Sequence, residues 1–260
     1  MRSELNIAKE AAIEAGGIIL NYYKADYEIQ EKSYHNPVTT ADREADARVK
    51  EILLEERPDY GWLSEETVDS QERLNKEHVW VVDPLDGTKE FIEGVPHFVV
   101  SIALVEGGQP TIGVLYNPVT GETFTAAQDE GAYLNGEPIH CVTKENVSEM
   151  VILNSRSETR QGLWVPYVGT FGELRAIGSV AYKLGLTAAG QADIFASLRP
   201  KSEWDICAGT CIIREAGGKV IDLNGNNISF NQKQIRIEPG LIAGDIQAVD
   251  KAYKVFIANT

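Results

Sequence analysis

Residues 80–91, WVVDPLDGTKEF, place two aspartates, a proline and a glycine directly after an apolar run. The β-branched and aromatic character of this run predicts a buried strand. Asp83-Pro84 and Asp86-Gly87 are turn-forming pairs and are expected to end the strand. Two carboxylates delivered to one edge of a core repel each other unless a cation compensates them. Such pairs alone are more often turns than metal sites, so a metal site requires other acids to converge on them.

Further acids occupy the predicted ends of elements elsewhere in the chain: Asp42, Glu65, Glu66 and Asp205. Each of them alone has an ordinary reading, as a helix-start charge or a solvated loop residue. Hard cations such as Mg²⁺ prefer oxygen ligands, so a few converging carboxylates could hold one or two ions. Zinc is not favoured, because the histidines at positions 35, 78, 97 and 140 form no pair at ligand spacing.

Gly87-Thr88-Lys89 is predicted to begin a helix immediately after the two aspartates. Free backbone N–H groups at a helix start bind anions, and glycine permits the close approach of a phosphate. A bound metal acidifies a water and neutralises developing charge, while the helix start holds the phosphate in line. The Thr88 hydroxyl could then orient that water. The pattern therefore indicates hydrolysis of a phosphate ester.

The elements that must position these residues begin with two helices. Residues 3–24 and 39–57 carry apolar residues at helical spacing. Residues 98–127 read as three strands joined by turns, and residues 131–139 add another strand with a turn at Asn135-Gly136. The first half thus predicts helices packed on an antiparallel sheet.

The second half alternates strands and helices, which predicts an α/β layer. Helices are expected to begin at Gly178-Ser179 and near Asp205, and the expected strands lie near residues 151–155, 193–197 and 219–223. The two halves, residues 1–148 and 149–260, should form one compact unit, because no linker near residue 148 is rich enough in Pro, Gly or Ser to separate them. The first half is expected to carry most metal ligands and the second the substrate side.

The composition bounds the class of protein. The chain has 260 residues, of which 43% are hydrophobic and 24% charged, as in ordinary soluble globular proteins. A formal net charge of −15 argues against a nucleic-acid polymer or an anionic membrane as the main partner. The first residues lack the apolar core of a signal peptide. Three cysteines suggest a reducing compartment without disulfides, and Cys207 and Cys211 read as core residues. A cytoplasmic protein is expected.

Asp83-Pro84-Leu85-Asp86-Gly87-Thr88 resembles the signature of the inositol monophosphatase superfamily of Mg²⁺-dependent, lithium-sensitive phosphatases. The resemblance extends to Val38-Thr39-Thr40-Ala41-Asp42, to Ser64-Glu65-Glu66 and to Trp204-Asp205-Ile206-Cys207-Ala208-Gly209. These blocks occur in the family's order and spacing and cover most of the chain. The resemblance implies a mixed α+β and α/β fold, a layered αβαβα sandwich.

The resemblance also implies roles for individual residues. Glu65, Asp83 and the Leu85 carbonyl resemble the ligands of a first Mg²⁺ ion. Asp83, Asp86 and Asp205 resemble those of a second, and Glu65 also faces a third, weaker ion. A separate pair, Thr88 and Asp42, resembles the dyad that positions and helps to deprotonate the nucleophilic water, while the backbone of Gly87 and Thr88 would hold the phosphate.

The substrate is a small phosphorylated metabolite on this reading. Family members that cleave inositol phosphates typically carry a glutamate where this chain has Ser197 or Leu198. The extension Lys89-Glu90-Phe91-Ile92 resembles the subgroup that removes the 3′-phosphate from adenosine 3′,5′-bisphosphate. A second phosphate would benefit from a cation, which Arg199 or Lys201 could supply. Gly178 and Ser179, at a helix start, could add backbone donors to the substrate.

Bisphosphate nucleotidase is therefore favoured over inositol-1-monophosphatase, with histidinol-phosphatase as a third choice. A different class of function is a catalytically silent member that binds phosphorylated ligands. Such a protein would be expected to lose Glu65, Asp86 or Thr88, and all three are present. The resemblance is compatible with a monomer or a homodimer.

Overall fold

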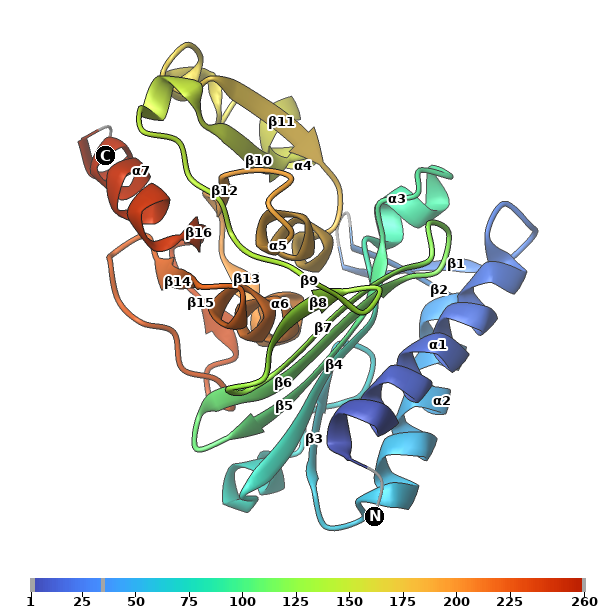
Figure 1. Cartoon of the computed structure of the whole chain (residues 1–260). Helices are drawn as coiled ribbons and strands as arrows, with labels where there is room; N and C mark the ends of the chain where they lie inside the picture. Colours follow the sequence, from blue (N-terminus) through green and yellow to red (C-terminus); the bar gives the residue numbers. More distant parts are fainter. Residues whose placement is uncertain (1–2, 34–35, 259–260) are drawn as a thin grey trace.

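A seven-stranded sheet and a five-stranded sheet, each covered by helices on both faces, make up the fold (Figure 1). The computed structural model describes residues 3–33 and 36–258. From the N-terminal helices to the C-terminal helix, the layers follow the order αβαβα that the family resemblance implies.

The seven-stranded sheet runs in the order β3-β4-β5-β6-β7-β8-β9. Its strands are β3 (Gly61–Ser64), β4 (His78–Asp86), β5 (Val99–Glu106), β6 (Gln109–Asn117), β7 (Glu122–Ala127), β8 (Gly131–Leu134) and β9 (Glu137–Pro138). Neighbours from β4 onward are antiparallel, as predicted, whereas β3 pairs with β4 in parallel. The parallel pair brings the ends of both strands to the same edge, because parallel strands point the same way.

Strand β4 shows why its sequence is apolar at consecutive positions. Val79 and Val81 belong to the core between the two sheets, while Trp80 and Val82 belong to the core beneath the N-terminal helices. Side chains alternate between the faces of a strand, so a sheet covered on both faces needs an uninterrupted apolar run. The covering helices on the outer face are α1 (Glu4–Tyr22) and α2 (Thr40–Glu56).

Helices α5 (Val180–Ala188) and α6 (Glu203–Glu215) form the middle layer between the sheets (Figure 1). The approach of α6 to the large sheet is close. A Cβ atom at Gly113 in β6 would lie 2.4 Å from the Ala208 carbonyl oxygen. Only glycine therefore allows the backbone of α6 to rest on the sheet at this point.

The five-stranded sheet runs in the order β11-β10-β12-β16-β14 and is covered on its outer side by α7 (Ile246–Ala258). Its strands are β10 (Val151–Ser155), β11 (Glu173–Ile177), β12 (Ile194–Ser197), β14 (Gly218–Asp222) and β16 (Leu241–Asp245). The remaining elements are β1 (Ile29–Ser33), β2 (Asn36–Thr39), η1 (Gln71–Asn75), α3 (Thr88–Ile92), η2 (Val147–Glu149), α4 (Arg156–Arg160), η3 (Val165–Tyr167), β13 (Lys201–Ser202) and β15 (Arg236–Ile237). The position near residue 148 separates the strands of the two large sheets.

Two sequence expectations need correction in detail. Strand β4 does not end before Asp83 but continues to Asp86, with an irregularity in its pairing to β5 between these residues. Pro84 lies in this irregular stretch, where a missing N–H donor is tolerated. The segment 156–177, for which the sequence analysis expects no helix or strand, contains α4, η3 and β11. The expected burial of Cys207 and Cys211 is confirmed, and His35 lies outside the described residues.

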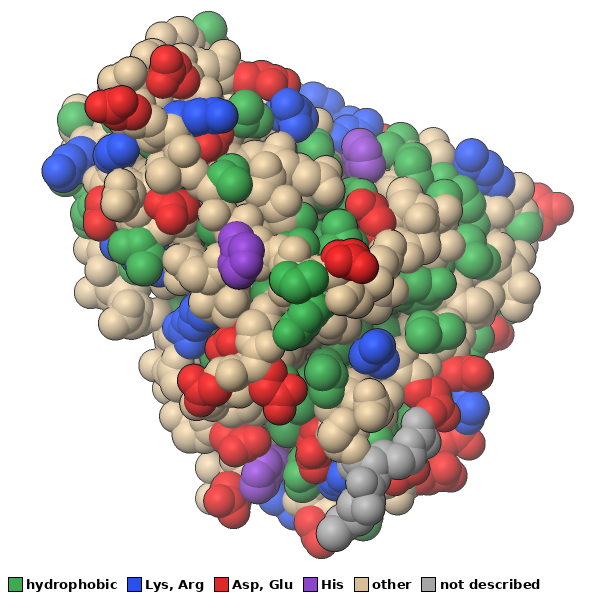
Figure 2. Space-filling model, in the orientation of Figure 1, with side chains coloured by type: hydrophobic (Ala, Val, Ile, Leu, Met, Phe, Trp, Pro, Cys, Tyr) green, Lys and Arg blue, Asp and Glu red, His purple; other side chains and the backbone are tan. Residues whose placement is uncertain are grey.

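Acidic side chains are unevenly distributed over the surface. In Figure 2, they gather over the lower part of this face, where Figure 1 places α1, α2 and one end of the large sheet.

Within residues 3–33 and 36–258, no helix combines the length and the apolar character needed to cross a membrane.

Candidate active site

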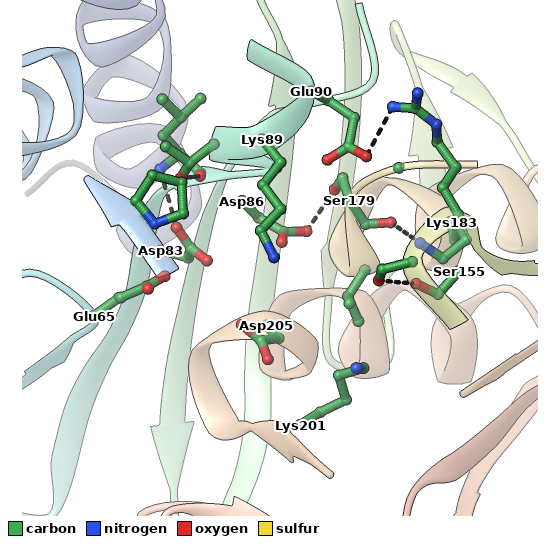
Figure 3. A pocket seen from close by; sticks show the side chains of 18 of the residues that line it. Glu65, Asp83, Asp86, Lys89, Glu90, Ser155, Ser179, Lys183, Lys201 and Asp205 are labelled. Carbon is green, nitrogen blue, oxygen red and sulfur yellow. Dashed lines mark hydrogen bonds and ion pairs between the residues drawn. The ribbon is translucent and has the colours of Figure 1, made fainter. Parts of the chain in front are cut away.

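Three carboxylates from distant parts of the chain meet beside the edge of the large sheet. Glu65, Asp83 and Asp205 each offer an oxygen within 4.8 Å of the others, a group that could hold a metal ion. Glu65 follows β3 and Asp83 lies near the end of the neighbouring parallel strand β4, so both reach the same edge. Asp205 arrives from the first turn of α6. Figure 3 shows Glu65 and Asp83 directed toward each other.

Asp86 joins this group to the start of α5. One of its carboxylate oxygens accepts hydrogen bonds from the Ser179 hydroxyl, at 2.5 Å, and from the Ala181 backbone N–H, at 2.6 Å. Ser179 is the N-cap residue of α5. The side chain is buried, and Figure 3 places it between Asp83 and Ser179. The first residues of α5 and its N-cap therefore fix the Asp86 carboxylate through hydrogen bonds, on the side away from Asp83.

The electrostatics of these acids favour a bound cation. Burial raises the pKa of Asp83 well above its ordinary value, and the charges of Glu65, Asp86 and Asp205 raise it further. Burial and the charges of Asp86 and Glu65 raise the pKa of Asp205 to about 7. Burial also raises the pKa of Asp86, although its bonds to Ser179 and Ala181 oppose the shift. Ionised carboxylates this close resist burial unless a cation compensates them, so the residues fit a hard divalent ion.

Thr88 and Asp42 form the predicted pair. The Thr88 hydroxyl lies 3.0 Å from an Asp42 carboxylate oxygen and 3.2 Å from the Leu85 carbonyl oxygen. The second oxygen of Asp42 accepts bonds from the N–H of Thr39, at 2.7 Å, and from its hydroxyl, at 2.5 Å. This capping box begins α2 and fixes the orientation of the carboxylate. Asp42 is buried and contacts the cavity through the Thr88 hydroxyl.

Gly87 precedes α3 in a left-handed conformation, with φ of 107°. A Cβ atom there would lie 2.7 Å from the His97 carbonyl oxygen and 3.0 Å from Phe98 Cβ. Both the backbone angle and the lack of space require glycine. The tight turn places the Thr88 hydroxyl beside the Leu85 carbonyl oxygen of β4.

These residues line a cavity of about 300 Å³. The predicted site residues among its lining are Glu65, Asp83, Leu85, Asp86, Gly87, Thr88, Gly178, Ser179, Lys201 and Asp205. Asp42 lies behind this wall. Arg199 is not among the described residues that line the cavity, and it is exposed.

The cavity contains cations that sequence reasoning missed. Lys183 is buried, donates from Nζ to the carbonyl oxygens of Ser179 and Ile177, and has its pKa lowered by burial to about 8. Arg156 also lines the cavity and bonds Glu90 at 3.0 Å. The one-turn spacing from Ser179 to Lys183 was the signal that could have placed Lys183 near the site, because residues four apart share a helix face.

Comparison with known proteins identifies the family of this chain. The model of the "Inositol monophosphatase family" matches residues 1–253. The chain belongs to the inositol monophosphatase family. Members of this family are phosphatases that typically use Mg²⁺, so the protein is a phosphatase of this family. Its acidic cluster is a group that could hold such an ion.

Individual relatives cover nearly the whole chain. It is 35% identical over 237 residues to "Nus factor SuhB" of Pasteurella multocida, and the alignment covers 87% of this chain and 88% of that protein. It is 32% identical over 243 residues to "Inositol monophosphatase 3" of Solanum lycopersicum, with 89% and 90% covered. The crystal structure of CysQ from Bacteroides thetaiotaomicron superimposes with a TM-score of 0.77 at 31% identity, covering 94% of this chain and 97% of that one.

Proposed function

We propose that this protein is a Mg²⁺-dependent phosphomonoesterase that removes the 3′-phosphate from adenosine 3′,5′-bisphosphate. One observation carries the proposal: a single cavity combines converging carboxylates with several cations. In Figure 3, Glu65 and Asp83 lie on the left of the cavity and Lys183 on the right, and Lys89 extends into the space between them.

The carboxylate end supports the hydrolytic step. Glu65, Asp83, Asp86, Asp205 and the Leu85 carbonyl would hold two to three Mg²⁺ ions. When bound, the ions acidify a water and neutralise charge on the phosphoryl group. Water attacks phosphorus and loses a proton as the new phosphorus–oxygen bond forms. The bond from phosphorus to the ribose 3′-oxygen breaks, and that oxygen takes a proton from solvent water.

The protein's own residues orient the reactants. The Thr88 hydroxyl donates its hydrogen to an Asp42 carboxylate oxygen, with the two oxygens 3.0 Å apart. The Thr88 oxygen therefore keeps a lone pair to accept a hydrogen bond from the attacking water. The buried and fully bonded Asp42 is the group toward which a proton would move. Backbone N–H groups after Gly87 are proposed to bind the phosphate oxygens.

The cationic end of the cavity, formed by Lys183 and Lys201, supports a substrate with a second phosphate. Lys201 lines the cavity, with Nζ 3.8 Å from a carboxylate oxygen of the buried Glu158, and Lys183 lines it as well. Cations in a partly buried site bind phosphate through charge-assisted hydrogen bonds. The position of the inositol-gripping glutamate is filled differently: the Ser197 hydroxyl and the Leu198 N–H both donate to Glu158. Neither Ser197 nor Leu198 has a carboxylate that could bind the ring hydroxyls of an inositol phosphate.

Inositol-1-monophosphatase is the second candidate, favoured by the name and the 32% identity of the Solanum lycopersicum relative. Phosphate release should be measured from adenosine 3′,5′-bisphosphate, adenosine 3′-monophosphate, inositol 1-phosphate, fructose 1,6-bisphosphate and histidinol phosphate, with Mg²⁺ and with EDTA. The bisphosphate nucleotide is expected to have the highest kcat/KM. Preference for inositol 1-phosphate would select the second candidate, and turnover unaffected by EDTA would refute both.

A matched pair of variants tests the cationic end. Lys201→Met should lower kcat/KM for adenosine 3′,5′-bisphosphate by roughly 10-fold or more, the value of one charge-assisted hydrogen bond, and should spare adenosine 3′-monophosphate. Arg199→Met, two residues away but exposed and outside the cavity lining, is the control and should change neither value. Equal losses for both substrates in Lys201→Met would refute contact with the second phosphate.

A further inference from the structure

Asp46 lies one helical turn after Asp42 on α2 and contacts the segment that carries Glu65. One Asp46 carboxylate oxygen accepts a short hydrogen bond from the Ser64 hydroxyl, and the other accepts from the Thr67 hydroxyl at 2.7 Å. The residue is only 7% exposed. Ser64 directly precedes Glu65 and Thr67 follows it by two positions, so Asp46 is bonded on both sides of this ligand.

Glu65 lies in a less regular part of the backbone than the other acids do. Asp83 is held by the pairing of β4 with β5, and Asp205 by the first turn of α6. Glu65 instead lies in a bend beyond the end of β3. Its backbone N–H donates to the Val82 carbonyl oxygen at a long 3.3 Å. The Asp46 bonds to Ser64 and Thr67 therefore constrain the path of the chain on both sides of Glu65, in addition to this backbone bond.

Repulsion makes that anchoring necessary. The carboxylate oxygens of Glu65, Asp83 and Asp205 approach within 4.8 Å of one another. Like charges at such distances repel in a partly buried site. Of the three, the residue on the bend can relieve the repulsion with the smallest rearrangement, by swinging away. A metal would then have to draw Glu65 back, and binding would be weaker by the free energy of that rearrangement.

We propose that Asp46 is a positioning residue that holds Glu65 ready for the metal. Helix α2 would then support the site at two successive turns, with Asp42 orienting Thr88 and Asp46 orienting Glu65. The role rests on the proposed metal site. A buried anchor that serves only the stability of the fold is the alternative, and metal affinity separates the two.

The test measures metal binding without turnover. Binding of Mn²⁺, a divalent ion that suits carboxylate ligands, is followed by electron paramagnetic resonance of the free ion, and the melting temperature is recorded without metal. Asp46→Ala should raise the Kd for Mn²⁺ roughly 10- to 100-fold, as for other groups that orient metal ligands. Thr67→Val keeps the shape and the Asp46 charge but removes one hydroxyl, and should give an intermediate Kd.

A charge-matched control excludes a long-range effect. Glu55 is exposed on the same helix, so Glu55→Gln changes the net charge as Asp46→Ala does and should leave the Kd unchanged. The double variant Asp46→Ala with Thr67→Val should bind like Asp46→Ala alone, because both changes remove the same anchor.

Several results would overturn the proposal. Wild-type Kd values in Asp46→Ala and Thr67→Val with lowered melting temperatures would leave Asp46 a stability anchor only. An equal loss in Glu55→Gln would attribute the effect to net charge. If Asp46→Ala does not fold, Thr67→Val decides alone. Absence of Mn²⁺ binding by the wild-type protein is a distinct result, because it refutes the proposed metal site and leaves Asp46 no ligand to position.

Discussion

Replacing Asp205 with asparagine is expected to stabilise the metal-free protein. The Asp205 carboxylate lies within 4.8 Å of oxygens of Glu65 and Asp83. Burial and the charges of Asp86 and Glu65 raise its pKa from 3.8 to about 7. A carboxyl with a higher pKa in the folded protein than in the unfolded chain makes folding less favourable once it ionises. This loss of stability accumulates as the pH rises from about 4 to about 7.

The magnitude follows from that difference in pKa. About three pKa units correspond to about 4 kcal/mol at pH 8. Because the Asp205 side chain keeps partial contact with solvent, we expect about half of this, ~2 kcal/mol. The lost negative charge in the first turn of α6 opposes the gain by about 0.5 kcal/mol. The metal-free Asp205→Asn protein should therefore be about 1–2 kcal/mol more stable than the wild type at pH 8, with a smaller difference at pH 5.

The assay is urea unfolding with EDTA at pH 5 and pH 8, and again at pH 8 with saturating Mg²⁺. Mg²⁺ should reverse the order, because the variant lacks one of the ligands through which the ion stabilises the folded state. Glu55→Gln, on the exposed side of α2, serves as control and should follow the wild type. If metal-free Asp205→Asn is less stable than the wild type at pH 8, the carboxylates do not repel one another as argued.

Three further changes test the site and the fold. Thr88→Val should lower kcat roughly 10²- to 10⁴-fold with melting temperature nearly unchanged, since it removes an orienting hydroxyl; normal kcat would exclude the Thr88–Asp42 pair. Asp83→Asn should abolish phosphate release and Mn²⁺ binding together, and near-normal turnover would refute the metal assignment. Gly113→Ala should lower the free energy of unfolding by about 2 kcal/mol or more, because its Cβ would lie 2.4 Å from the Ala208 carbonyl oxygen; calorimetry showing no loss would contradict the close approach of α6 to β6.

Local chemistry made much of the fold predictable. The Thr39 cap with Asp42 three residues later forms the capping box that begins α2. Interactions between residues near in sequence set these boundaries, so the pattern needs no knowledge of the rest of the chain. The segment 156–177 was not predictable in this way. Strand β11 exists because it pairs with β10, more than 20 positions earlier, and strand pairing depends on a partner that sequence periodicity does not reveal.

The candidate site, like the fold, was only partly predictable from the sequence. The types and order of Asp83, Asp86 and Glu65 indicated a metal, because converging carboxylates have few other uses. The sequence could not show which of Arg199 and Lys201 lines the cavity. Residues two apart can point in different directions once a strand ends, and only the packing around β13 decided in favour of Lys201.

The amino-acid sequence by itself predicted which groups could do the chemistry, because ligand type, glycine turns and helix caps are properties of short segments. Only the tertiary structure decided what surrounds them. Asp46 bonds residues 18 and 21 positions away, and Ser179 reaches Asp86 across 93 positions. Contacts of this kind arise when separate elements bury their apolar faces together, and burial fixes distances that no local pattern encodes.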